Sequence, residues 1–350
     1  MAIRVGDLTS ELRNRSRVVT AHMGDVELIH EGDSAGTLRV GDIRLPWGDR
    51  TTQMLMGFFK GPGYKYLLRQ PLSWQAEVVR HHAEAMADNE SVWYIEGSNV
   101  AGIYHPDAKM IPLSLVAEQI ADVFDPDAMA SVLYSPDQVE INVTSFARTV
   151  TVPGISGFAG RPGEGEVEHP YTKMKVGDLS AGGVRIIIHP GKPERAPVVQ
   201  EFWERLACTN GMTRTISGST INLRGRTVEE ILQEMNKIMR VIWEGLEESG
   251  RLILHSAQAL IPGATSDFIR QVARERGINA ATILRLQERA MSLPANPTAY
   301  DVAQVMTALA NEEGVAVLTR RNLQMAGGDL TIDADRMVHR CGQCERPLAA

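Results

Sequence analysis

The spacing of hydrophobic positions changes several times along the chain, and each change predicts a different element. Within residues 1–50, short apolar segments are broken by Gly and Asp, as at Val26–His30 and Gly36–Val40. This pattern predicts a small N-terminal β region. Residues 52–89 then take the helical period of apolar positions, and Ser73 is expected to cap a helix there.

The middle of the chain reads as hairpins joined by short turns, with helices between them. The expected elements are hairpin strands Val92–Ile95 and Val100–Tyr104, a helix Ser114–Phe124, hairpin strands Met129–Tyr134 and Gln138–Thr144, a strand Val184–His189 and a helix Ala196–Cys208. Pro153–Gly165 is rich in Gly and Pro and is expected to be a loop. Because short turns leave no room for crossover helices, these strands predict an antiparallel sheet.

The last third of the chain is predicted to be mainly helical. Thr227 and Glu230 have the spacing of a capping box, and the apolar face that follows is expected to end at Gly250. Further helices are expected over Ser266–Arg276, Ala280–Ser292 and Thr298–Asn311.

These elements together predict an α+β fold, in which an antiparallel sheet built from hairpins carries packed helices and a mostly helical C-terminal region follows. The expected divisions are a small β region at 1–50, an α+β core at 51–260 with its Gly/Pro-rich loop at 153–165, a helical region at 261–312 and a tail at 313–350 that contains a Cys-x2-Cys motif.

Composition narrows the class of protein. The chain has 350 residues, of which 43% are hydrophobic and 23% charged, values typical of a globular protein. Its net charge of −7 argues against coating nucleic acid by bulk electrostatics, so a nucleic-acid site would have to be a local basic patch. No apolar run of about eighteen residues and no signal-peptide pattern is visible, which predicts a cytoplasmic protein without a membrane partner.

One segment resembles a known family. Phe202–Met212 reads FWERLACTNGM, and its Cys-Thr-Asn-Gly core is similar to the signature of phage and plasmid proteins that carry the domain of unknown function 932. The order of elements over 58–311 agrees with that family in character. The resemblance implies a DNA-metabolism accessory in a phage-infected or plasmid-bearing bacterial host, and it supplies no catalytic residues.

The Cys-Thr-Asn-Gly core has a structural and a functional interpretation. At the end of a helix, Asn210 or Gly211 would adopt the left-handed conformation that closes the last turn. A catalytic Cys208 would need a base or a positive field, and no His lies near it in the sequence. A third interpretation makes the segment a polar loop that faces a ligand. We therefore predict no catalytic residue, although enzymatic use of Cys208 stays an alternative.

Basic and aromatic residues supply the candidate nucleic-acid site. Alternation along a strand would place Tyr171, Lys173 and Lys175 on one face, where a ring can stack on a base and two amines can neutralise phosphates. The full candidate set is Tyr171, Lys173, Lys175, Arg185, Asn210, Arg214, Arg224 and Arg226. The alternative is that these side chains are an ordinary solvated surface.

A structural zinc site is the candidate cofactor. His339, Cys341 and Cys344 give three potential ligands around a Cys-x2-Cys turn. One such motif is half of a usual zinc site, so the alternative is a tail with free thiols. Phosphate-binding loops of nucleotide hydrolases and dinucleotide-binding loops are missing from the sequence.

The favoured function is binding of single-stranded DNA without ATP, in assistance of annealing or recombination. The order of strands and helices is compatible with the core of Rad52-like annealing proteins, which act as homo-oligomeric rings, although fold analogy carries little functional weight. The alternative is a homo-oligomeric structural or interaction protein of a phage, with no catalytic activity.

Overall fold

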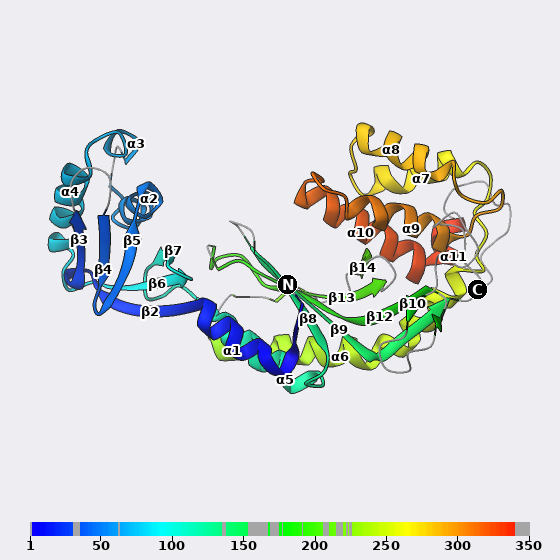
Figure 1. The fold of residues 1–350 in the computed structure, drawn as a ribbon, viewed down its shortest axis with the longest axis horizontal. Helices are drawn as coiled ribbons and strands as arrows, with labels where there is room; N and C mark the ends of the chain where they lie inside the picture. Colours follow the sequence, from blue (N-terminus) through cyan, green and yellow to red (C-terminus); the bar gives the residue numbers. More distant parts are fainter. Residues whose placement is uncertain are drawn as a thin grey trace.

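The fold is α+β, as the sequence predicts. The computed structural model describes residues 2–30, 36–61, 64–134, 138–152, 167–168, 175–176, 178–190, 192–205, 210–214, 220–221, 223 and 226–339. The predicted loop at 153–165 lies outside these residues. Figure 1 shows the N-terminal lobe, the main sheet and the C-terminal helices arranged as a crescent, with the sheet in the middle.

The main sheet has six strands in the order β1-β8-β9-β12-β13-β14, and all neighbours are antiparallel. The strands are β1 (Ala2–Arg4), β8 (Met129–Tyr134), β9 (Val139–Val152), β12 (Asp178–Ile188), β13 (Val198–Arg205) and β14 (Asn210–Arg214). A separate two-stranded ribbon pairs β10 (Val167–Glu168) with β11 (Lys175–Val176). The hairpin β8-β9 and the strand at Val184–His189 confirm the sequence predictions.

β13 corrects one prediction, because the segment expected to be a helix from Ala196 to Cys208 is a strand. The strand is buried on both faces: Val199 and Trp203 pack into the hydrophobic core of the sheet, while Phe202 points to the opposite face. Burial on both sides removes the alternation of polar and apolar residues that marks a half-buried strand. The FWERLACTNGM segment therefore begins in β13 and ends in β14. The four residues between these two strands lie outside the described residues.

Three helices cover one face of the sheet (Figure 1): α1 (Val5–Arg15), α5 (Leu113–Val123) and α6 (Val228–Ser256). The predicted capping box is confirmed, because the Thr227 hydroxyl accepts from the Glu230 N–H at 3.2 Å and the Glu230 carboxylate accepts from the Thr227 N–H at 2.7 Å. The helix does not end at Gly250 as predicted. Gly250 is buried and faces the Trp203 ring, so its small size serves packing rather than termination.

The N-terminal lobe comprises residues 16–104. Its elements are β2 (Ser16–His22), a short 3-10 turn η1 (Met23–Asp25), β3 (Val26–His30), β4 (Gly36–Val40), β5 (Ile43–Trp47), α2 (Asp49–Phe58), α3 (Tyr64–Leu67), α4 (Leu72–Ala85), β6 (Glu90–Glu96) and β7 (Asn99–Tyr104). The sheets β2-β6-β7 and β3-β4-β5 share a core with the helices, which includes Leu38 and Trp93. The lobe thus extends well beyond the expected β region at 1–50. Ser73 does not cap α4, whose N-cap is Pro71.

The C-terminal helices are α7 (Thr265–Glu275), α8 (Ala280–Ala290), α9 (Ala299–Ala310), α10 (Val317–Ile332) and α11 (Ala334–His339). The first three confirm the predicted helices. α10 and α11 lie in the segment expected to be a tail, and Leu323 and Leu330 of α10 are part of the core of this helical group. α10 packs above the main sheet, on the face opposite α6 (Figure 1).

The N-terminal lobe is an insertion in the central part of the molecule. β1 pairs with β8 through the register Ile3↔Ala130, and Leu8 and Leu12 of α1 pack into the central core with α5. Residues 2–15 therefore belong with residues 105–256, and the lobe at 16–104 leaves and re-enters this unit. This connection places the end of α1 beside the β6-β7 hairpin.

Candidate ligand pocket and nucleic-acid interface

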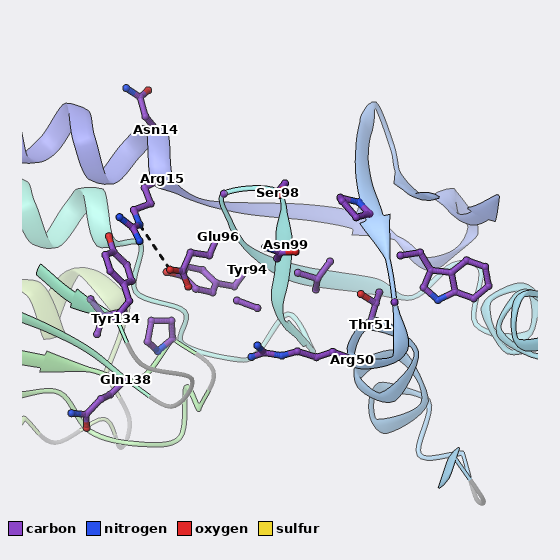
Figure 2. A pocket seen from close by; sticks show the side chains of 18 of the residues that line it. Asn14, Arg15, Arg50, Thr51, Tyr94, Glu96, Ser98, Asn99, Tyr134 and Gln138 are labelled. Atoms are coloured by element: carbon purple, nitrogen blue, oxygen red, sulfur yellow. Dashed lines mark ion pairs between the residues drawn. The ribbon is translucent and has the colours of Figure 1, made fainter. Parts of the chain in front are cut away.

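A cavity of about 900 Å³ lies between the N-terminal lobe and the main sheet. We call it the tyrosine pocket. Its walls come from the end of α1, the β5-α2 junction, the β6-β7 hairpin and the β8-β9 hairpin, and Figure 2 shows its side chains. Segments distant in sequence meet here because the lobe is inserted between α1 and α5. A volume of this size lies in the range of small-molecule sites.

Two tyrosines give the pocket its name. Tyr94 on β6 is only 1% exposed, and Tyr134 ends β8. Among the described residues, neither hydroxyl meets a hydrogen-bond partner in good geometry. Ser16 is close enough to Tyr94 to influence its pKa, but the Ser16 hydroxyl donates to the Leu12 carbonyl at 3.0 Å. Both hydroxyl oxygens are closed to solvent, and a buried hydroxyl without a well-placed partner costs stability.

Burial keeps both phenols protonated. Desolvation raises the pKa of Tyr94 well above its usual value and that of Tyr134 to about 12, against a partial lowering by Arg15. At neutral pH each side chain is therefore an uncharged O–H group.

Arg15 is held on the α1 side of the pocket. Its guanidinium lies 3.8 Å from the centre of the Tyr134 ring, and its Nε is 4.0 Å from Glu96 Oε1 (Figure 2). The ring fixes the guanidinium through a cation–π contact, and the Glu96 carboxylate offsets its charge. Arg15 thus mainly orders this wall.

Arg50 is the cation of the opposite wall. It occupies the first turn of α2, is exposed, and forms no ion pair among the residues that the structure describes. Gly48, the N-cap of α2, gives no side-chain cap, so the first backbone N–H groups of the helix lack the usual side-chain acceptor. Figure 2 shows the Arg50 side chain extending from α2 toward the side where Tyr94 and Tyr134 lie. The Thr51 and Thr52 N–H groups donate to the Gly48 carbonyl, and Asp49 in the same turn offsets part of the positive charge of this helix end.

Arg50 also lines a second cavity of about 770 Å³ between α2 and β7, which we call the cationic groove. Lys60 at the end of α2, Lys192 after β12 and His105 after β7 line it as well. Among the described residues of this lining there is no carboxylate. The groove therefore concentrates positive charge on a chain whose net charge is negative.

Aromatic side chains interleave with these cations. The rings of Phe58 and His105 stack with centroids 4.6 Å apart. The Tyr104 hydroxyl donates to the Pro190 carbonyl at 3.0 Å, and burial with the nearby Glu194 raises the pKa of Tyr104 to about 12. Gly102 is required here, because a Cβ at this position would overlap the Tyr104 ring. Rings beside cations are the usual surface for unpaired bases.

Arg185, predicted to contact nucleic acid, is instead buried between the main sheet and α10. It is 2% exposed, and its guanidinium donates to Asn142 Oδ1 and to Gln324 Oε1, each at 2.7 Å. Its burial removes it from the residues that could reach a phosphate at the surface. The sequence places Arg185 on a strand but does not reveal that α10 covers the face on which its side chain lies.

Among the other predicted contacts, Arg226 is the one whose side chain the structure describes. Arg226 precedes α6, 3.9 Å from Glu234, while Lys175 lies in β11 and Asn210 and Arg214 lie in β14, where only their backbone is described. Tyr171, Lys173 and Arg224 lie outside the described residues. No described residue of this set lines the tyrosine pocket or the cationic groove.

Most of the predicted zinc ligands also lie outside the described residues. His339 ends α11, and Cys341 and Cys344 follow the described part of the chain. Within that part, no group of three or more His, Cys, Asp or Glu side chains is arranged to hold a metal. The zinc site stays a prediction.

Sequence reasoning missed the residues that the cavities bring together. Arg50, Lys60 and Lys192 lie in separate segments, so no local spacing marks them. Tyr94 lies within β6 and Tyr134 ends β8, and both resemble ordinary core residues of apolar strands. The only available signal was their position beside two hairpin turns, where strand ends meet solvent.

Compared with known protein families, curated proteins and solved structures, the chain gives no match. The resemblance of Phe202–Met212 to a phage and plasmid family thus stays a prediction. The helices that the structure describes include none with the length and apolar character needed to cross a bilayer.

Proposed function

We propose that this protein binds single-stranded DNA without ATP, through the cationic groove, as an accessory of annealing or recombination. The observation that carries the proposal is the lining of the groove, where Arg50, Lys60 and Lys192 occur with His105 and without a carboxylate among the described residues. A single strand presents a phosphate at every nucleotide, and phosphates are the groups that such a set of cations attracts.

Aromatic rings support a single strand over a duplex. Tyr104 and the exposed His105 lie at the groove with the cations, and unpaired bases offer flat faces on which such rings stack, whereas Phe58 is buried against His105. In a duplex these faces are covered by neighbouring base pairs. A cavity of about 770 Å³ is also small for a double helix, so the groove fits one extended strand.

Binding of a fluorescent oligonucleotide with a 5′-hydroxyl end tests the proposal. With three cations in contact, log Kobs should fall with log salt at a slope of about −2, from roughly −0.7 per phosphate contact on a single strand. Fluorescence anisotropy at salt concentrations from about 50 to about 300 mM measures the slope.

Charge reversal locates the contact. Lys60→Glu together with Lys192→Glu should weaken binding by at least about tenfold and flatten the slope, since each reversal replaces attraction by repulsion. Lys237→Glu is the matched control, because Lys237 is an exposed lysine of α6 outside the groove. Equal losses in both variants, or no salt-dependent binding by the unaltered protein, would overturn the proposal. A large oligomer indifferent to DNA in mass photometry would favour the structural alternative.

A further inference from the structure

Two exposed aromatic rings lie side by side on the N-terminal lobe. Among the described residues of the lobe, the large apolar side chains that are exposed are Tyr66 of α3, at 63%, and Trp74 of α4, at 42%. Their ring centroids are 6.0 Å apart and their planes are perpendicular. We call this pair the aromatic platform. An edge-to-face contact orders both rings while much of their surface stays open to solvent.

Buried hydrogen bonds hold the support of the platform in place. Gln75, the neighbour of Trp74, is 2% exposed and accepts from the Thr52 hydroxyl of α2 at 2.9 Å. Its side-chain amide donates to the Gln70 carbonyl at 3.0 Å. These bonds fix the first turn of α4 and the connection from α3 against α2. Rings on a fixed support lose little freedom when a ligand stacks on them.

The charge around the platform is positive. Residues 50–76 contain four cations, Arg50, Lys60, Lys65 and Arg69, and no Asp or Glu. Lys65 and Arg69 are exposed on either side of Tyr66 in the sequence. The next acid along the chain, Glu77, is 4.0 Å from Arg80. A partner that suits this surface carries negative charge together with flat rings.

The platform continues from the cationic groove. Lys60 lines the groove at the end of α2, and α3 follows it in the chain. α3 packs against α2, since Leu67 and Phe58 belong to the same core. Figure 1 shows α3 at the end of the lobe, beside α2. A strand that leaves the groove past Lys60 therefore meets the platform next.

We infer that the aromatic platform is a second contact of a single DNA strand, on which unpaired bases stack after the strand leaves the cationic groove. The inference rests on the proposed function and extends it, because it assigns base contacts to Tyr66 and Trp74 and phosphate contacts to Lys65 and Arg69. Stacking on such rings accepts any base, so the platform adds affinity without sequence preference.

A membrane surface fits the platform less well. Rings and lysines also occur on helices that lie on membranes, but such helices insert an aliphatic face. Here the neighbouring leucines turn inward: Leu67 is buried, and Leu72 packs against the core of the lobe. Rings and cations, without exposed leucines beside them, favour a nucleic acid.

Trp74→Ala is the variant that tests the inference. It should weaken binding of a single-stranded oligonucleotide about tenfold, as for loss of one stacked base. The factor should be the same at low and high salt, because stacking releases no counterions. Trp74→Phe keeps a ring and should restore most of the affinity. Leu284→Ala on α8 is the matched control, since Leu284 is an exposed apolar residue outside the lobe.

An abasic strand of the same length separates bases from phosphates. It keeps the backbone charges, so the unaltered protein and Trp74→Ala should bind it equally. Trp74 is the exposed one of the five tryptophans, so stacking should also quench tryptophan fluorescence, and Trp74→Ala should remove this quenching. Urea unfolding checks that the variant is folded.

The outcomes distinguish the inference from the proposed function. If strands bind with a salt-dependent affinity that neither Trp74→Ala nor Tyr66→Leu changes, the inference fails and the proposed function stands. If Trp74→Ala weakens binding but Lys60→Glu with Lys192→Glu does not, the groove is not the site and the platform stands. Binding to phosphatidylserine vesicles that depends on Trp74, without binding of any strand, overturns both.

Discussion

At the scale of single residues, Arg185 is the most constrained side chain of the main sheet. Asn142 and Gln324 accept hydrogen bonds from its guanidinium, Glu140 lies 3.1 Å from its Nε, and the guanidinium lies 4.6 Å from the centre of the Phe202 ring. These contacts join β9, β12 and β13 to α10. Desolvation lowers the pKa of Arg185, while the Glu140 carboxylate works in the opposite direction.

Arg185→Met is expected to destabilise the protein by about 3–5 kcal/mol, because it leaves the partly buried Glu140 carboxylate and the Gln324 amide without their partner. Urea unfolding measures the change. Arg251→Met is the control, since Arg251 pairs with Glu247 on the exposed face of α6, and its loss should cost under about 1 kcal/mol. A similar small loss for Arg185 would show that the buried network contributes little.

The sequence predicts the chemical character of the candidate site but not the residues that form it. The sequence indicates that any nucleic-acid site must be a local patch of cations and rings, and the cationic groove has that composition. It does not indicate which residues, because Arg50, Lys60 and Lys192 are brought together by tertiary packing. The prediction for Arg185 was wrong for a similar reason, because the sequence does not show that a distant helix covers its strand.

At the scale of elements, the sequence predicted those helices and strands whose ends are set by local signals such as turns and helix caps. The hairpins β6-β7 and β8-β9 follow from short turns between apolar segments, and α6 and α9 begin at capping boxes. The predictions for the segments of β13 and α10 were wrong, since both elements are covered on more than one side. The Gly327-Gly328 pair within α10 also reads as a helix break, although it lies in the helix interior.

Gly327 explains why that break does not occur. A Cβ at this position would lie 2.6 Å from Thr307 Cγ2 and 3.3 Å from the Ala303 carbonyl oxygen, so the glycine allows α10 to approach α9 closely. The helix thus exchanges intrinsic propensity for close packing.

A pair of glycine-to-alanine substitutions tests this account. Gly327→Ala should destabilise the protein by about 1–3 kcal/mol through overpacking. Gly245→Ala in α6 should instead stabilise it by about 0.5–1 kcal/mol, because nothing lies within 4 Å of the added methyl and alanine favours the helix. Denaturant midpoints of the two variants should therefore move in opposite directions. A shift of both toward higher stability would mean that the α9-α10 contact tolerates the methyl group.

At the scale of the whole molecule, the described residues form three hydrophobic cores, which divide the chain differently from its sequence order. The N-terminal lobe has its own core, the C-terminal helices have another, and the central core combines residues 2–15 with later strands and helices. Homo-oligomer formation stays a prediction at this scale.

Two leucines distinguish the central core from the lobe. Leu8 of α1 and Leu38 of β4 are both fully buried, and truncation of either to Ala should cost about 2–5 kcal/mol. Hydrogen exchange should rise in α5 and β8-β9 for Leu8→Ala, and in β3-β5 for Leu38→Ala. If Leu8→Ala loosened the lobe instead, α1 would belong energetically to its neighbour in sequence rather than to α5.

The insertion of the lobe also sets an order of events during synthesis. Residues 2–15 leave the ribosome about 120 residues before β8, the strand that β1 pairs with, is complete. At roughly 5–20 residues per second, they wait about 6–24 s for their partner. During this interval the apolar face of α1, with Val5, Leu8 and Leu12, is without its native cover, and the lobe gains its last strand once residue 104 has been made. The lobe can therefore complete its own sheets before β1 and β8 are able to pair.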